Sequence, residues 1–270
     1  MTEKQYLKEN DKRFKALLES LRRMVYIPDE YNKEYKDYLD GIMVTFGTVF
    51  ATLMNQQMKG AVDLTIAQLA AQSAWYVEAV STLGYTKRVV VDSSKLVTTM
   101  MESRLPTGYT LSQRIWDFKS YSKDIEAIIR NGITNNLHRN TIAKQLDSFL
   151  LPHKRLTALT PYGRTLSSDS LRVAQTEIWE SYRRGTVEYA KQAPWITGLV
   201  WTLSAAHLEL CDCDDLDGTV FAPSAVPMAP HPRCQCSLVP QMVTKRNWSK
   251  ALRDVGLGVA AYGLYDWLEG

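Results

Sequence analysis

The sequence predicts an α+β protein, with a mainly helical N-terminal region and a small β-containing unit near the C-terminal end. Apolar residues recur at helical spacing over most of the chain up to about residue 190. After Pro194 the pattern changes to short runs of β-branched and aromatic residues. Hydrophobic residues make up 45% of the chain and charged residues 23%, which is the balance of a folded globular protein.

Three helices are expected at the start of the chain. The first covers residues 6–24, the second covers 31–59 and is apolar around most of its circumference, and Pro28 separates them. Gly60 is expected to separate the second helix from a third, whose apolar stripe is Ile66, Leu69, Ser73, Val77 and Val80. Residues 84–108 fit either a short strand or a connecting loop.

The helical pattern returns from residue 123 and continues to Pro194. The first of these helices has an apolar face made of Ile125, Ile128, Ile129, Gly132 and Ile133. Asn140 is expected to cap the next helix, which Pro152 ends and which carries Ile142, Leu146 and Phe149. A longer helix follows, with the stripe Leu171, Ala174, Ile178, Tyr182, Gly185 and Tyr189.

The β-containing unit is expected to hold three short strands, over residues 199–203, 220–221 and 238–239. Residues 222–232 between the last two contain four prolines, which excludes a helix or a central strand there. From residue 247 to 270 apolar residues again recur at helical spacing, interrupted by glycines. We therefore expect a loop between the last two strands and a helical tail after them.

Charge and hydropathy exclude some classes of protein. No apolar run approaches the roughly 20 residues that span a bilayer, and the first residues lack the apolar stretch of a secretory signal. The net charge is only +3, well below that of a dedicated nucleic-acid binder. However, residues 114–164 carry nine Lys or Arg against four Asp or Glu, whereas residues 205–218 carry five acids and no Lys or Arg. One part of the chain is therefore basic and another acidic.

One cluster carries metal-ligand chemistry: Cys211, Cys213, His231, Cys234 and Cys236. Two pairs of these ligands could close a tetrahedral structural zinc site, because thiolates and imidazole are the ligands that zinc prefers, and such a site would stabilise a small β unit. Reduced buried thiols and disulfides stay open as alternatives, because the C-x-C spacing is less specific than C-x-x-C. His231, which stands between two prolines, could equally be a structural hydrogen-bonding residue.

The acidic residues around the first cysteine pair also suggest a calcium loop. The register excludes it, because Asp217 stands where such a loop needs glycine and Pro223 where it needs the final glutamate. A solvated turn with Asp217 and Gly218 at its tip is the better interpretation. Glu177 could be a catalytic carboxylate, but a structural ion pair or hydrogen bond is the simpler expectation.

Three blocks of sequence, taken in their order along the chain, form a recognisable pattern. They are LRVAQTE at residues 171–177, WTLSAAHLELCDCDDLDG at 201–218 and VPMAPHPRCQC at 226–236. Together they resemble the minor head, or head morphogenesis, family named after the F protein of phage Mu, over about residues 125–240. The residues that match the family motifs are Arg172, Thr176, Glu177, Trp201, His207, Asp217, Gly218, Pro230 and Pro232. The chain departs from the family at Gln175, where arginine is usual, and in the C-x-C spacing of its first cysteine pair.

The resemblance implies a structural protein of a tailed bacteriophage that acts in capsid morphogenesis. Its implied partners are the portal protein and the major capsid or scaffolding protein, with contact to double-stranded DNA and no membrane. Its implied location is the virion, in the capsid interior or portal region, and the host cytoplasm during assembly. The implied organisation is a helical docking region over residues 1–120, the minor head domain over 121–246 and the helical tail over 247–270.

DNA contact is expected as part of this role, and an enzyme is weighed as the alternative to it. Contact with DNA phosphates would use the basic stretch, through Arg130, Arg139, Lys144, Lys154 and Arg155, although the same residues also fit an ordinary solvated face. The enzymatic alternative is a zinc-dependent hydrolase or nuclease, or an ADP-ribosyltransferase-like enzyme. The chain shows no H-E-x-x-H, G-x-S-x-G or Walker glycine loop, and only 30 residues follow Pro240. We therefore expect a protein that is not an enzyme.

Overall fold

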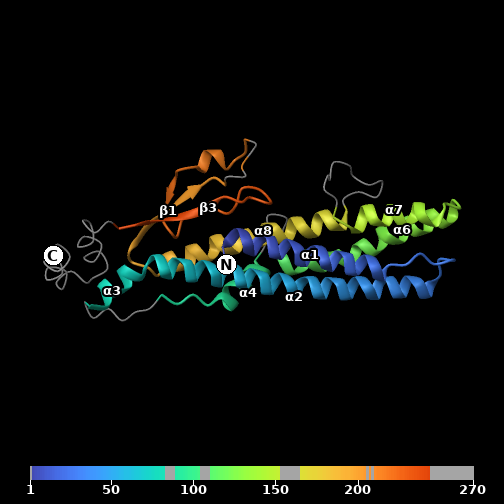
Figure 1. The fold of residues 1–270 in the computed structure, drawn as a ribbon, viewed down its shortest axis with the longest axis horizontal. Helices are drawn as coiled ribbons and strands as arrows, with labels where there is room; N and C mark the ends of the chain where they lie inside the picture. Colours follow the sequence, from blue (N-terminus) through green and yellow to red (C-terminus); the bar gives the residue numbers. More distant parts are fainter. Residues whose placement is uncertain are drawn as a thin grey trace. The chain divides into compact units, whose positions relative to one another are not determined.

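A computed structural model describes residues 2–82, 89–103, 110–152, 165–204, 207 and 210–243. Within these residues the chain is mainly helical and ends in a small antiparallel sheet, which confirms the α+β class (Figure 1). No helix among the described residues is both long enough and apolar enough to cross a membrane. The expected tail, residues 247–270, lies outside the described residues.

The first two helices confirm the N-terminal pattern but correct one boundary. Helix α1 covers Glu3–Met24, and α2 runs from Lys33 to Gln72 without a break at Gly60. One glycine in a helix costs only about 1 kcal/mol relative to alanine. Because Met58, Ala61 and Val62 beside it are fully buried, packing outweighs that cost and the helix continues.

Shorter helical elements follow α2, and one of them, α4, lies in residues 84–108, where the sequence indicated a strand or a loop. Helix α3 covers Ala74–Thr82 and α4 covers Ser93–Glu102, while the described residues just before α4 are neither helix nor strand. Helix α5 spans Leu111–Trp116 and leads into the 3-10 turn η1, Asp117–Tyr121. The alternatives of strand and loop were therefore wrong for α4. Its apolar positions Val97, Met100 and Met101 fit a helix once they are buried.

Helices α6, Ser122–Thr134, and α7, Arg139–Leu150, pack against each other as an antiparallel pair joined by a short turn. The N-cap of α7 is His138, whose side chain accepts a hydrogen bond from the backbone of Asn140, so the expected cap at Asn140 was wrong. The two helices meet closely at Gly132, where an added Cβ would lie 2.5 Å from Cγ1 of Ile142. The turn after α6 places Asn136 at a φ of 51°, which asparagine tolerates better than most residues.

Helix α8, Leu166–Ala190, is the long helix that the periodicity predicted. Its described residues are buried or half-buried around the whole circumference, although the sequence includes many serines, arginines and acids. Buried polar groups need partners. In α8 they find them close by: Thr186 donates to the carbonyl of Tyr182, and Arg183 pairs with Glu180.

The sheet has the strand order β2-β1-β3, with β1 (Ile196–Thr202) between β2 (Val220–Phe221) and β3 (Ser237–Met242). All three predicted strands are thus confirmed. Leu199 and Trp201 of β1 point into a core that also contains Tyr189 and Trp195. Trp195 donates its indole N–H to the hydroxyl of Ser73 at 2.9 Å.

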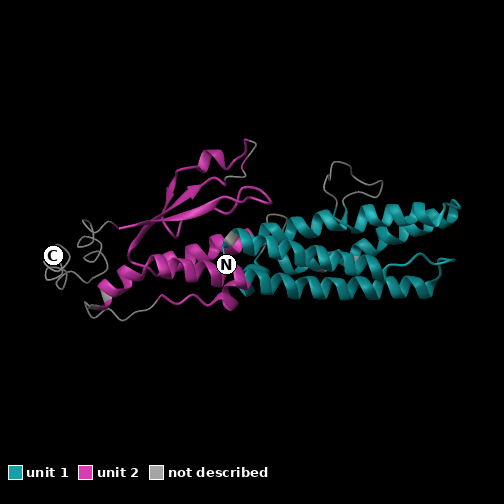
Figure 2. Cartoon of the chain, in the orientation of Figure 1, with its two compact units in different colours: residues 1–58, 97–178 teal, residues 59–96, 179–270 magenta. Residues whose placement is uncertain are grey.

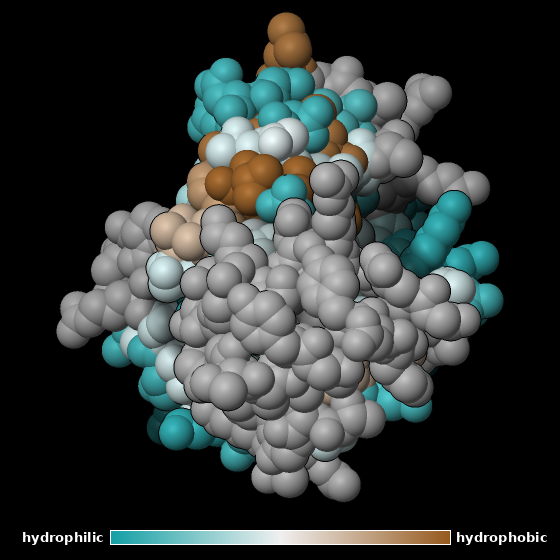
Figure 3. All heavy atoms as spheres, turned by 90° about the vertical axis from the view of Figure 1, so that its left-hand side faces the viewer, coloured by the Kyte–Doolittle hydropathy of each residue, from teal (hydrophilic) through white to brown (hydrophobic). Residues whose placement is uncertain are grey.

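The other face of the sheet carries a row of valines. Val200 on the central strand is paired in register with Val220 on one side and Val239 on the other. Val220 and Val239 are both about half exposed. Apolar side chains gather in one part of the otherwise mostly hydrophilic described surface in Figure 3.

The contacts divide the chain into two compact units, shown in Figure 2. Unit 1 consists of residues 1–58 and 97–178, and unit 2 of residues 59–96 and 179–270, so the boundaries fall inside α2, α4 and α8. The segments expected from the sequence, 1–120, 121–246 and 247–270, follow the family resemblance rather than contacts, and they stay a prediction. Unit 1 has a helical core in which the ring of Phe50 contacts the tilted ring of Phe14 and meets the ring of Phe118 edge to face, and unit 2 contains the sheet.

Candidate metal centre

The topology of the sheet brings the two cysteine pairs together. Cys211 and Cys213 lie in the turn between β1 and β2, and Cys234 and Cys236 lie just before β3. Ser237, the first residue of β3, pairs with Thr202, the last residue of β1. Since β2 and β3 flank the same strand, the segments that precede them meet at its C-terminal end. The four cysteines therefore gather at one end of the sheet.

The sulfur and imidazole atoms lie at short distances. Nε2 of His231 is 3.2 Å from Sγ of Cys211 and 3.2 Å from Sγ of Cys213. Sγ of Cys213 is 3.5 Å from Sγ of Cys234, too long for a disulfide, and all four cysteines are free. Cys236 completes a second close group with Cys213 and Cys234. These Cys and His side chains could hold a metal ion.

Hydrogen bonds fix the turn that carries the first pair. The carboxylate of Asp214 accepts the backbone N–H of Cys211 at 2.7 Å and lies 3.1 Å from Nε2 of His207. The N–H of Cys211 holds the pKa of Asp214 below its usual range, with His207 adding to the effect. Asp217 accepts the N–H of Leu203, and Gly218 adopts a φ of 71°, a region that favours glycine. Asp217 and Gly218 were expected at the tip of this turn, but the N–H of Gly218 donates to the carbonyl of Trp201, so both residues lie at its base, beside the end of β1.

Burial affects the thiols of this cluster. Cys213, Cys234 and Cys236 are almost completely buried, whereas Cys211 is half-buried. Burial raises the pKa of Cys213 above its usual value, and neighbouring thiols add to the shift. Burial also raises the pKa of Cys236. The thiols of Cys213 and Cys236 would therefore stay protonated at neutral pH unless a metal ion binds.

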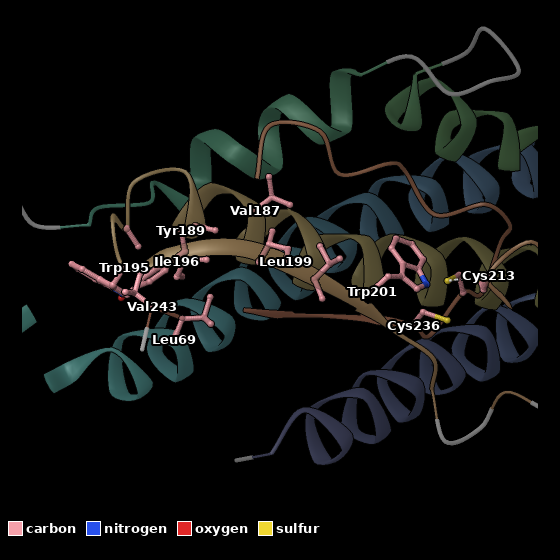
Figure 4. Packing of buried hydrophobic residues seen from close by; sticks show 14 of the residues in the cluster. Leu69, Val187, Tyr189, Trp195, Ile196, Leu199, Trp201, Cys213, Cys236 and Val243 are labelled. Carbon is pink, nitrogen blue, oxygen red and sulfur yellow. Dashed lines mark hydrogen bonds between the residues drawn. The ribbon is translucent and has the colours of Figure 1, made fainter. Parts of the chain in front are cut away.

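A buried arginine lies beneath the second cysteine pair. Nη1 of Arg183 donates to the carbonyl oxygens of Cys234 at 3.2 Å and Cys236 at 2.9 Å, and lies 3.7 Å from Sγ of Cys234. Its Cζ is 5.9 Å from the ring centre of Trp201. Figure 4 shows the indole of Trp201 extending toward Cys213 and Cys236. Nη2 of Arg183 and Nε1 of Trp201 are buried and have no hydrogen-bond partner among the described residues.

We compared the chain with models of protein families, with curated proteins and with solved structures. None of them matches. The geometry of this cluster and the sequence resemblance therefore carry the functional argument.

The motif residues of α8 form local contacts within unit 1. Arg172 pairs with Asp169 at 2.5 Å, and Asp169 also accepts the hydroxyl of Tyr121. The hydroxyl of Thr176 donates to the carbonyl of Arg172 at 2.7 Å. Glu177 is half-buried on the same helix. These contacts fit structural roles for Arg172 and Thr176.

The other motif residues surround the metal-ligand cluster in unit 2. Trp201 is buried in β1, and His207, Asp217 and Gly218 belong to the turn described above. Pro230 and Pro232 flank His231, whose Nδ1 lies 2.9 Å from the carbonyl oxygen of Pro232.

The residues expected to contact DNA lie in several elements of unit 1. Arg130, on α6, pairs with Glu126 and stacks over the ring of Tyr31. Arg139, at the start of α7, bonds Asp29 and the carbonyl of Ile27. Lys144 is exposed on α7, while Lys154 and Arg155 lie outside the described residues. Two of the three described cations thus have carboxylate partners.

Sequence reasoning missed Arg183. It lies on the long helix, about fifty residues before the cysteines that it contacts, and nothing in the local sequence distinguishes it from Arg184. Its burial, with 4% of the side chain exposed, is the signal that identifies it.

Proposed function

We propose that this chain is a structural minor head protein of a tailed bacteriophage, whose C-terminal β unit is held together by a structural zinc ion. The observation that carries the zinc assignment is the convergence of three thiols and one imidazole at the end of β1. The ligands would be Cys211, Cys213, His231 and Cys234. This set includes all three of the short contacts, at 3.2, 3.2 and 3.5 Å.

The three short contacts come close to three edges of a tetrahedral site, and the two groups of close ligand atoms share Cys213. With bonds of about 2.3 Å to sulfur and about 2.0 Å to nitrogen, ligand atoms lie about 3.8 Å apart for two sulfurs and about 3.5 Å for sulfur and nitrogen. His231 would bind through Nε2 while its Nδ1–H donates to the carbonyl of Pro232, the usual arrangement of a metal-bound histidine. The metal would supply a cross-link between the turn before β2 and the loop before β3.

A contact with a buried arginine supports a thiolate rather than a thiol at Cys234. Nη1 of Arg183 lies 3.7 Å from Sγ of Cys234 and can donate to it. A thiolate accepts such a hydrogen bond better than a neutral thiol does. Metal binding deprotonates cysteine and so produces that acceptor.

The number of protein ligands favours a structural role over hydrolysis. Catalytic zinc sites usually keep three protein ligands and one open position for water, whereas structural sites are closed by four. The proposed set provides four protein atoms. It therefore supports a protein that is not an enzyme over a zinc-dependent hydrolase or nuclease.

The phage assignment rests on the sequence resemblance. The tryptophan strand, the Leu-Asp-Gly turn and the His-Pro-Arg-Cys-Gln-Cys segment all lie within one unit, around the metal-ligand cluster. Segments that build one site are expected to occur together in the sequence motif of a family. We propose that the protein acts in the virion, in the capsid interior or portal region, after assembly in the host cytoplasm.

Helix α2 offers a surface for the portal protein, which we propose as the main partner beside the major capsid or scaffolding protein. Residues 41–58 contain no charged residue, yet Val44 and Val49 are 43% and 45% exposed. On the same exposed face, Thr45, Thr48 and Thr52 donate their hydroxyls to carbonyls of their own helix. With their hydroxyls satisfied, these threonines can accept an apolar partner at little cost.

The experiment is co-purification with a tagged portal protein encoded by the same genome as this chain. Val44→Asp and Val49→Asp, made together, are expected to abolish capture by the tagged portal protein. Val90→Asp is the control, because Val90 is 69% exposed but belongs to unit 2 and not to α2. No capture of the wild-type chain, together with its absence from purified particles by mass spectrometry, would overturn the proposed function.

A further inference from the structure

The structure carries one more assignment at the metal centre, which rests on the proposed zinc site. We infer that Arg183 is a positioning residue for the metal: its guanidinium holds the Cys234 turn in its binding shape and supplies the positive charge that the metal and its thiolates require.

The contacts of Arg183 are directed at the backbone of this turn. One nitrogen, Nη1, reaches the carbonyl oxygens of both Cys234 and Cys236 and approaches the sulfur of Cys234. On its other side, Nε of Arg183 donates to Glu180 at 2.9 Å. The guanidinium therefore connects α8 to two alternate residues of the loop before β3.

The turn needs such support because its backbone is unusual. Arg233, the residue before Cys234, adopts a φ of 60°, which residues other than glycine and asparagine rarely do. No helix or strand hydrogen bonds hold residues 232–236. Contacts from Arg183 to both carbonyls fix the direction in which the Cys234 side chain leaves the turn.

The charges also agree with this assignment. A zinc ion with three thiolates and a neutral imidazole carries one negative charge. Arg183 shares the carboxylate of Glu180 with Arg184, so these three side chains together carry one positive charge. Because Arg183 is only 4% exposed, its charge is poorly screened by water and needs a nearby negative charge. Zinc bound by four thiolates would carry two negative charges, one more than the positive charge of these side chains balances. A disulfide is neutral and would leave the positive charge of Arg183 without a counter-charge.

The contacts of Arg183 differ between Cys234 and Cys236, although the sulfurs of both lie close to Sγ of Cys213. Arg183 uses the carbonyl oxygen of Cys236, whereas at Cys234 it reaches both the carbonyl and the sulfur. We therefore assign Cys236 to the support of the site and not to its ligands.

The test compares variants of the full chain by competition for zinc with a chromophoric chelator and by the absorption spectrum with cobalt(II). Arg183→Gln is expected to weaken zinc binding about 10- to 100-fold, the usual effect of losing a group that orients a ligand, and to shift the thiolate-to-cobalt charge-transfer band. Arg184→Gln is the matched control, because Arg184 pairs with the same carboxylate but is 41% exposed. It is expected to keep the wild-type affinity and spectrum.

Two further variants complete the test. Arg183→Lys keeps the charge without the planar fork, so an intermediate affinity is expected. Cys236→Ser is expected to keep the four-coordinate cobalt spectrum, whereas Cys234→Ser should lose it. Wild-type affinity in both Arg183→Gln and Arg183→Lys, or equal weakening in Arg184→Gln, would overturn the role of Arg183. If Arg183→Gln fails to fold, wild-type affinity and spectrum in Arg183→Lys alone would overturn it. Failure of the wild-type chain to bind zinc or cobalt would instead overturn the proposed zinc site itself.

Discussion

Chelation of the metal should loosen the loop of unit 2 that the two cysteine pairs enclose. Twenty residues separate Cys213 from Cys234, and the segment contains only the 3-10 turn η2, Asp214–Leu216, and the two residues of β2. In the chain-entropy model, closing a loop of this size contributes about 3 kcal/mol. Removal of the cross-link should therefore lower the free energy of opening of this segment by about that amount.

Hydrogen exchange followed by mass spectrometry measures this effect directly. A change of about 3 kcal/mol corresponds to exchange roughly 100-fold faster for amides that exchange through the opening. The acceleration is expected in peptides from residues 196–242 and should be reversed when zinc is restored. Peptides from α6 and α7, in unit 1, serve as the internal control and should not change.

The reasoning would fail if chelation left exchange in residues 196–242 unchanged. It would also fail if chelation accelerated exchange equally in α6 and α7, because the metal would then act on the whole chain rather than on this loop.

Two other predictions test the packing and the charge of unit 1. In Gly132→Ala the added Cβ would lie 2.5 Å from Cγ1 of Ile142. Such overpacking costs about 1–3 kcal/mol of folding stability. The higher helix propensity of alanine offsets roughly 1 kcal/mol of that cost, so we expect a net loss of stability. Measured by urea unfolding, Ile142→Ala should destabilise the Gly132→Ala variant less than it destabilises the wild type. Equal losses of stability in the two backgrounds would argue against a clash between the two side chains. DNA binding, if it uses Arg130, Arg139 and Lys144, should weaken steeply with salt and fall when all three are replaced by serine. A gel shift that is the same for the wild type and the triple variant would show that these residues do not bind DNA.

The periodic helices and strands could be predicted because their signal is local. The stripe of Ile125, Ile128 and Ile129 faces the core in α6, and the run that became β1 is apolar and β-branched over consecutive positions. Gly60 misled the prediction, because a local helix breaker counts for less than the buried contacts on either side of it.

Other features depended on contacts that no local pattern contains. The helix α4 was missed, since ten residues with two serines and two threonines give a weak stripe until Val97 and Met100 are seen to be buried. The two compact units were not predictable either, because each combines segments far apart in the sequence.

The candidate site was only partly visible in the sequence. Two cysteine pairs and a histidine between prolines indicated a shared site, and the sheet places them at the end of one strand. The role of Arg183 depends on α8 packing beneath the loop before β3, so it required the fold.

The metal content of the native chain tests the central claim most directly. Elemental analysis after dialysis, combined with titration of thiols before and after chelation, gives both the metal and the state of the four cysteines. The account predicts one zinc ion per chain, whose removal makes the ligand thiols Cys211, Cys213 and Cys234 reactive. No bound metal, with either two free thiols and one disulfide or four free thiols before any chelator is added, would contradict it.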